Sequence, residues 1–236
     1  MQLHYHKELS KDHNNLIFDP VESRHIVKVL RHSVGDSMYV TNGNGLLING
    51  KIINANPKHC ELEIITSKQF SKTHDYYLHI GIAPTKNIDR FEWFLEKATE
   101  IGVDHITPLL CERSERKVVK NDRLEKILIA AMKQSVQYHL PVLDELQKYA
   151  DFIKKPFEGQ RFIAHCLPDE KLSFKASLSQ VKTIQILIGP EGDFSEHEIE
   201  LALKQNFRPI TLGNTRLRTE TAGIVATHTV NLKYSV

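Results

Sequence analysis

The stretch from Thr211 to Gly223, TLGNTRLRTETAG, constrains the fold more than any other part of the chain. It reads as a strand end, a tight turn at Gly213-Asn214 and the start of a helix near Thr219. In α/β domains such a segment presents main-chain N–H groups to a ligand. The pattern equally fits an ordinary strand-to-helix connection with solvated arginines, so both interpretations stay open at this point.

A second stretch, LIGPEGDFS at 187–195, ends a buried strand in a turn and starts another helix with a capping box. Gly189 and Gly192 let a ligand approach the main chain closely. The lysine of a P-loop is missing, and so is the glycine spacing of a dinucleotide fingerprint. Because the turn carries an acid, Glu191, and few cations, it favours a neutral or cationic ligand over a polyphosphate.

Composition narrows the class of protein. The 236 residues are 41% hydrophobic and 25% charged, with a net charge of +2, as in ordinary soluble proteins. Cys60, Cys111 and Cys166 are far apart and show no C-x-x-C spacing, which argues against disulfides or a zinc site. The chain start lacks an apolar signal segment, and no apolar run is long enough to span a membrane. We therefore expect a soluble, cytoplasmic protein.

The N-terminal segment reads as β-rich with one helix. Asp19 and the proline after it predict the helix start, and Gly35 predicts its end. Arg24, Lys28 and Arg31 are spaced to share one helical face. That face is either simply solvated or a surface that contacts phosphates.

Short strands complete this segment. We predict strands at 37–40 and 46–53 around the hairpin signal NGNG at 42–45, and a half-buried strand at 60–66. The polar run 67–75 is the best domain boundary. These elements predict a small barrel-like domain over 1–70 and a second domain over 76–236.

In the second domain, strands alternate with helices, which predicts a parallel sheet covered on both faces. One helix, 88–101, has a clear apolar face and a stop at Gly102. The other predicted elements are strands at 77–83, 105–110, 161–166, 184–188 and 209–212, and helices at 124–137, 196–205 and from 219 towards 232.

Two motif blocks resemble the RsmE family of RNA methyltransferases: IGPEGDFSEHE at 188–198 and LGNTRLRTETA at 212–222. The resemblance continues in RHIVKVLR at 24–31, KATEIGV at 97–103 and ERSERK at 112–117, and so spans nearly the whole chain. Family members use S-adenosylmethionine to methylate N3 of a uridine in small-subunit (16S) ribosomal RNA.

The resemblance implies an α/β fold class: a C-terminal SPOUT domain with a parallel sheet and a deep trefoil knot, preceded by a β-rich PUA-like barrel. It also implies a homodimer, and 16S ribosomal RNA or the small ribosomal subunit as partner. S-adenosylmethionine would be the cofactor, held mainly by main-chain groups of the knotted loops. The residues implied to bind it are His165, Ile188, Gly189, Pro190, Glu191, Gly192, Leu212, Gly213, Asn214, Arg216 and Leu217.

Methylation of N3 requires loss of the imide proton and stabilisation of the negative charge left on the base. Arg218, or alternatively Arg216, is our candidate for the stabilising cation. Glu220 is the candidate proton acceptor. The same glutamate also fits a plain structural role, as an acid that stabilises the first turn of the last helix.

Basic residues are the candidates for RNA contact. Arg113, Arg116 and Lys117 follow a strand end, where loops border the ligand crevice of α/β sheets. Together with the three basic residues of the first helix and Gln134, they would form a track for phosphates.

The chain departs from the family pattern at a few positions. The family usually carries an acid where this chain has Lys133 and an arginine where it has Gln137, so substrate positioning is in question there. Asp193 replaces a commoner glycine. These changes keep two alternatives open: a SPOUT enzyme with another target, such as a ribose 2′-hydroxyl, and a catalytically silent RNA-binding protein.

We expect no metal site. His4 and His6 would lie on one face of a strand, but no third ligand is evident.

Overall fold

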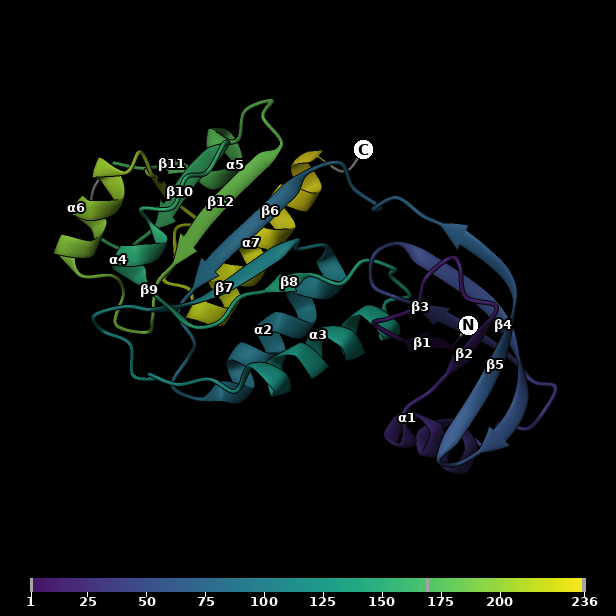
Figure 1. Cartoon of the computed structure of the whole chain (residues 1–236). Helices are drawn as coiled ribbons and strands as arrows, with labels where there is room; N and C mark the ends of the chain where they lie inside the picture. The colour runs from purple at the N-terminus through teal and green to yellow at the C-terminus, as the bar shows by residue number, and fades with distance from the viewer. Residues whose placement is uncertain (1, 169, 235–236) are drawn as a thin grey trace. The chain divides into compact units, whose positions relative to one another are not determined.

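The computed structural model describes residues 2–168 and 170–234, which form two compact units (Figure 1). The first unit comprises Met1–Thr73 and Met132–Leu140, and the second His74–Ala131 and Pro141–Val236. Each unit has its own sheet. Within the described ranges, no helix is long and apolar enough to cross a membrane.

The first unit is built on a five-stranded sheet in the order β1-β3-β4-β5-β2. Its strands are β1 (Leu3–Tyr5), β2 (Asn15–Ile17), β3 (Ser37–Thr41), β4 (Leu46–Asn56) and β5 (His59–Gln69). The antiparallel β3–β4 pair confirms the predicted hairpin. Alternate side chains of the long strands, such as Ile48 and Leu62, are fully buried and form the core with Ile26 of the helical segment.

The hairpin turn also packs against the segment 132–140. The Gly45 N–H donates to the carbonyl oxygen of Tyr138 (2.7 Å), and the Leu140 N–H donates to that of Gly43 (2.8 Å). A Cβ on Gly45 would lie 2.3 Å from the Phe70 carbonyl oxygen, and its φ of +84° also favours glycine. The two turn glycines therefore allow a distant segment to join this unit.

The helix of the first unit differs from the prediction. α1 (Pro20–Arg24) begins after the Asp19 cap as expected, but η1 (His25–Val29) continues it as a π-helix. Arg31 then adopts a left-handed φ of +62° and ends the helical segment, so the predicted stop at Gly35 is wrong. Arg24, Lys28 and Arg31 are all exposed, but they do not share the face of one continuous α-helix.

The second unit contains an eight-stranded sheet in the order β11-β13-β10-β12-β6-β7-β8, with β9 paired to β7. Every pairing in it is parallel, as predicted. The strands are β6 (Tyr77–Ile82), β7 (His105–Leu110), β8 (Val142–Leu143), β9 (Gln147–Lys148), β10 (Gln160–Ala164), β11 (Leu172–Ser173), β12 (Thr183–Ile188) and β13 (Arg208–Thr211).

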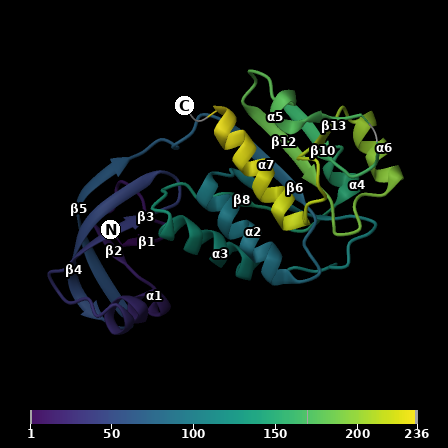
Figure 2. The same cartoon turned by 180° about the vertical axis from the view of Figure 1, so that it is seen from behind.

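Helices cover both faces of this sheet, also as predicted (Figures 1 and 2). α4 and α6 lie on one face, while α2 and α7 lie on the other with α3 beside α2. The helices are α2 (Ile88–Ile101), α3 (Asn121–Gln134), α4 (Tyr149–Phe152), α5 (Phe174–Ser177), α6 (Glu196–Lys204) and α7 (Thr219–Tyr234). Gly102 caps α2 with a φ of +117°, and a capping box starts α6, both as the sequence indicates.

The last helix packs very closely on α2. A Cβ on Gly223 of α7 would lie 2.5 Å from a ring carbon of Phe94 and 3.1 Å from Ile82 Cδ1. Phe94 and Ile82 are fully buried, so neither can move aside cheaply. Gly223 thus sets how deeply α7 lies against α2 and β6.

A row of polar side chains crosses the sheet. Arg161, Gln185, His79 and His105 stand opposite one another on β10, β12, β6 and β7. Arg161 Nε donates to Gln185 Oε1 (3.1 Å), and the Gln185 amide nitrogen lies 3.3 Å from His79 Nδ1. The two imidazole rings stack with centroids 3.8 Å apart. The row continues beyond β7 to the carboxylate of Asp144, 3.1 Å from His105 Nε2.

The hydrogen bonds of this row run in one direction. An amide NH₂ group can only donate, so His79 Nδ1 accepts and its Nε2 carries the proton. That Nε2 then donates to Thr107 Oγ1 (2.7 Å), and the Thr107 hydroxyl donates to Asp144 Oδ2 (2.6 Å). His79, His105 and Asp144 are close enough to hold a metal ion, but these hydrogen bonds already use both nitrogens of His79.

The row makes stability depend on pH. Burial, reinforced by the neighbouring His105, lowers the pKa of His79 from 6.5 to about 3. The unfolded chain therefore binds a proton at this position that the folded chain rejects. The contribution of His79 is fully present above pH 6.5 and is lost as the pH falls towards 3.

We predict that the free energy of unfolding falls between about pH 7.5 and about pH 5, by at most about 1.4 kcal/mol per pH unit from this residue. Urea unfolding of the wild type and of His79→Gln at both pH values measures it, and the variant should lose less stability on acidification. His197→Gln, on the exposed face of α6, is the control. Equal acid losses in the wild type and His79→Gln would contradict the prediction.

Candidate active site

The candidate site is a cavity of about 320 Å³ at the carboxyl ends of the parallel strands of the second unit. Ala164, Ile188 and Ile210 stand opposite one another near the ends of β10, β12 and β13, and all of them line it. The carboxyl edge of a parallel sheet is where α/β domains bind ligands. The lining residues are Arg90, Ala164, His165, Cys166, Ile188, Gly189, Pro190, Glu191, Asp193, Ile210, Thr211, Leu212, Gly213, Thr215, Arg216, Leu217, Arg218, Thr219, Glu220 and Ala222.

The turn after β12 forms one wall. A Cβ on Gly189 would lie 3.1 Å from both the main-chain nitrogen and a ring carbon of Phe194, so this turn needs glycine. Asp193 has a left-handed φ of +63°, a conformation that the glycine expected from the family pattern would adopt without strain. Aspartate tolerates that conformation and adds two hydrogen bonds: its carboxylate accepts the N–H groups of Cys166 (2.8 Å) and Phe194 (2.9 Å). Partial burial, reinforced by the Asp193 carboxylate, raises the pKa of the Cys166 thiol.

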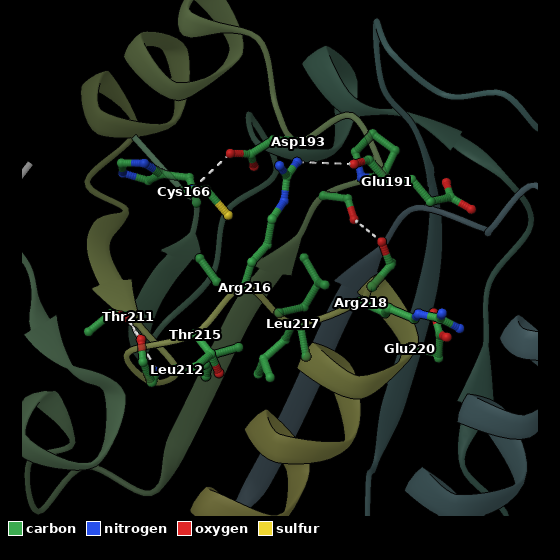
Figure 3. A pocket seen from close by; sticks show the side chains of 18 of the residues that line it. Cys166, Glu191, Asp193, Thr211, Leu212, Thr215, Arg216, Leu217, Arg218 and Glu220 are labelled. Carbon is green, nitrogen blue, oxygen red and sulfur yellow. Dashed lines mark hydrogen bonds between the residues drawn. The ribbon is translucent and has the colours of Figure 1, made fainter. Parts of the chain in front are cut away.

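The segment before α7 forms the opposite wall (Figure 3). The Thr219 hydroxyl donates to the carbonyl oxygen of Gly189 (3.0 Å), and Arg216 Nη2 approaches that of Glu191 (3.5 Å). The turn itself is closed by Thr211, whose hydroxyl donates to the Gly213 carbonyl oxygen (2.7 Å). Side-chain hydrogen bonds thus join the two glycine turns that the sequence singled out.

The acids of the cavity differ in their partners. Glu191 Oε1 accepts the main-chain N–H of Lys86 (2.8 Å), and the Asp193 carboxylate is held as described above. Glu220, in the first turn of α7, is 7% exposed. Its Oε1 lies 3.9 Å from Nε of Arg90, near the start of α2. Glu220 is thus a nearly buried carboxylate that faces an arginine within the cavity.

Most residues predicted to bind a cofactor line this cavity. His165, Ile188, Gly189, Pro190, Glu191, Leu212, Gly213, Arg216 and Leu217 do so, as do the catalytic candidates Arg218 and Glu220. Gly192 and Asn214 belong to the same two turns but are not among the lining residues. Arg218, which directly precedes α7, is exposed, whereas Glu220 is buried.

The basic loop after β7 is bonded to the main chain around the cavity. Arg113 Nη1 donates to the carbonyl oxygens of Gly192 (3.0 Å) and Phe194 (3.4 Å). Arg116 donates to the carbonyl oxygens of Thr85 (2.9 Å) and Lys86 (2.6 Å). These two arginines brace the turns beside the cavity. Lys117, in the same loop, is exposed.

Lys133 and Gln137, two of the positions that depart from the family pattern, have partners within the first unit. Lys133 Nζ lies 3.6 Å from Oε1 of Glu22, whose pKa is lowered by a hydrogen bond from His4 and by this lysine. The Gln137 amide donates to the Ser135 hydroxyl (3.2 Å). Gln134, between them, is exposed. Lys133 therefore attaches the segment 132–140 to α1.

Arg90 and Thr219 are the main residues that the sequence did not identify. Arg90 is an ordinary exposed charge near a helix start, and only the packing of α2 beside α7 places it in the cavity. Thr219 was recognised as part of a helix start, but its hydrogen bond to Gly189 spans 30 residues of sequence. No local pattern signals either contact.

Comparison with known protein families gives two matches. Residues 72–231 match the model described as an RNA methyltransferase domain, and residues 19–65 match that of an RNA methyltransferase PUA domain. The chain is 31% identical to ribosomal RNA small subunit methyltransferase E of Rickettsia conorii, covering 95% of this chain and 89% of that protein. It is also 31% identical to the protein of the same name from Buchnera aphidicola, covering 91% and 87%.

Solved structures share the whole fold. A protein of Porphyromonas gingivalis described as a probable rRNA-methyltransferase superposes with a TM-score of 0.89 at 37% identity, covering 99% of this chain and 98% of that one. A protein of Legionella pneumophila, described as a methyltransferase and solved with the bound cofactor SAM, gives a TM-score of 0.88 at 27% identity, covering 98% and 96%.

Proposed function

The chain belongs to the family of RNA methyltransferases that carry a PUA domain, and we propose that it methylates N3 of a uridine in small-subunit (16S) ribosomal RNA with S-adenosylmethionine. The observation that carries this proposal is the cavity between the turns after β12 and β13, in a chain that is similar over 95% of its length to a small-subunit rRNA methyltransferase. The cytoplasm is the compartment that this substrate implies.

The cavity fits the proposed cofactor in size and chemistry. Its volume of about 320 Å³ is that of a small-molecule site. Its lining includes the apolar side chains of Ala164, Ile188 and Ile210, which suit a flat ring, and the acids Glu191 and Asp193, which suit a sulfonium ion. When bound, S-adenosylmethionine supplies an electrophilic methyl group. The eleven residues named from the family resemblance remain our proposal for its binding site.

The residues at the start of α7 are placed to act on the RNA base. Uracil N3 becomes nucleophilic only when its imide proton leaves, and Glu220 is a nearly buried carboxylate that can accept this proton. The negative charge then left on the base spreads to its carbonyl oxygens, where the guanidinium of Arg218 stabilises it. Both side chains line the same cavity (Figure 3).

RNA contact is assigned to exposed basic and polar residues: Arg24, Lys28, Arg31, Lys117 and Gln134. Arg113 and Arg116 each carry five N–H donors. Only part of these donate to main-chain carbonyl oxygens, so both side chains can also contact RNA. The trefoil knot and the homodimer that the resemblance implies stay predictions. Each follows from family membership rather than from a contact described above.

The decisive experiment is nucleoside mass spectrometry of 16S ribosomal RNA from a strain that lacks the gene. We expect N3-methyluridine to be missing, and to return when purified protein and S-adenosylmethionine are added to small subunits of that strain. Restoration of a ribose 2′-O-methyl nucleotide instead would support a different target. Absence of any methyl transfer, with no cofactor binding by calorimetry, would support a silent RNA-binding protein.

Arg218→Ala should lower kcat by at least about a hundred-fold while the affinity for S-adenosylmethionine changes little, because the lost cation acts on charge that develops during the reaction. Single-turnover methylation and calorimetry measure the two effects. Full turnover in this variant, with unchanged cofactor binding, would contradict the assigned role.

Arg113→Ala should weaken S-adenosylmethionine binding about ten-fold, because it removes two hydrogen bonds that hold the turn after β12. Lys117→Ala, which removes another exposed cation of the same loop, is the matched control and should weaken RNA binding alone. Calorimetry with the cofactor and filter binding with RNA separate the two. Should Arg113→Ala weaken only RNA binding, the bracing role is wrong.

A further inference from the structure

We propose that Arg90, Glu220 and Arg218 together read the Watson–Crick edge of the target base and select uracil, with Arg90 as a specificity residue. The inference rests on the proposed function and concerns the same cavity. It assigns a role to Arg90, a lining residue that no motif of the chain identifies.

Glu220 is the cavity acid whose carboxylate accepts no hydrogen bond from a main-chain N–H group among the described residues. Three acids line the described part of the cavity, and the main chain engages two of them: Glu191 accepts the N–H of Lys86, and Asp193 those of Cys166 and Phe194. Glu220 instead faces the Arg90 guanidinium at 3.9 Å, which is too long for a hydrogen bond. The two groups are therefore neighbours that still have donors and acceptors for a substrate.

Arginines supply donors from two different elements. Arg90 comes from α2 and is exposed, with its side chain 43% accessible. Arg218 precedes Glu220 by two residues and is also exposed. Arg216, by contrast, places its Nη2 3.5 Å from the carbonyl oxygen of Glu191 and helps to hold the turn after β12. The cavity thus offers an acceptor, Glu220, accompanied by the donors of Arg90 and Arg218.

This set of donors and acceptor is complementary to the Watson–Crick edge of uracil. The Watson–Crick edge of uracil presents an acceptor (O4), a donor (N3–H) and an acceptor (O2), which are complementary to donor, acceptor and donor. Cytosine presents a donor (N4–H₂), an acceptor (N3) and an acceptor (O2), so two of its groups would oppose like groups of the protein. Guanine presents acceptor, donor and donor, and its third group would oppose an arginine.

The same contacts serve selection and chemistry. The carboxylate that accepts the N3–H hydrogen bond is the group proposed to take the proton, and the arginines that bind O2 and O4 lie where negative charge spreads afterwards. A base whose N3 carries no proton cannot donate to this carboxylate and has no proton for it to take. Selection for uracil therefore follows from the same groups that activate it.

The test uses the full-length protein and small subunits from the strain lacking the gene, carrying either uridine or cytidine at the target position. For Arg90→Gln we expect kcat/KM with the uridine substrate to fall about ten- to a hundred-fold, the cost of one lost base-reading contact. Its ratio of uridine to cytidine kcat/KM, measured with sensitive radiolabel transfer, should fall by a similar factor. Calorimetric affinity for S-adenosylmethionine should stay within about two-fold of the wild type.

Arg123→Gln is the matched control, because Arg123 is an exposed arginine that pairs with Glu92 outside the cavity. It should leave kcat/KM and the uridine-to-cytidine ratio unchanged. Circular dichroism and cofactor binding establish that each variant is folded.

The outcomes separate the two proposals. A wild type that forms no N3-methyluridine overturns the proposed function. An active wild type with Arg90→Gln unchanged in kcat/KM and in discrimination overturns the reading role alone. If Arg90→Gln loses activity but keeps the wild-type ratio of uridine to cytidine, Arg90 does not select the base, and the inference fails as well.

Discussion

The close approach of α7 to α2 at Gly223 is the constraint on which the site depends. A side chain at this position would run into Phe94 and Ile82, so only glycine lets the helix lie this deep. Since α7 starts one turn before Gly223, its depth decides where Thr219 and Glu220 lie. At this depth the Thr219 hydroxyl donates to the carbonyl oxygen of Gly189, and Glu220 Oε1 lies 3.9 Å from Nε of Arg90. A core contact thus sets the geometry of the cavity.

Much of this arrangement is predictable from the sequence, because it rests on local signals. Both glycine turns, the capping box of α6, the stop of α2 at Gly102 and the parallel sheet follow from turn chemistry, capping and alternating elements. Parallel strands end at a common edge, so turns that follow neighbouring strands must come together. The family resemblance then gives these turns a chemical meaning.

The parts that sequence reasoning missed depend on contacts between distant residues. The π-helical continuation of α1 and the left-handed Arg31 show no composition signal, since the apolar pattern of an α-helix continues to that point. The role of the hairpin glycines in receiving the segment 132–140 needs a partner about a hundred residues away. The polar row from Arg161 to Asp144 is equally invisible, because four strands each contribute one or two of its members.

The basic residues show why charge alone is a weak guide to function. Arg113 and Arg116 stand in a run of charges that suggests phosphate binding, yet their guanidinium groups donate to main-chain carbonyls beside the cavity. Arg90 stands in no such run, yet it faces Glu220, the cavity acid to which no main-chain N–H group donates among the described residues. An arginine acts on a ligand when packing leaves its donors unsatisfied at a concave surface. Whether donors are left unsatisfied depends on the assembled fold. This difference separates Arg113 and Arg116, which brace the turns, from Arg90 and Arg218, which are proposed to contact the base.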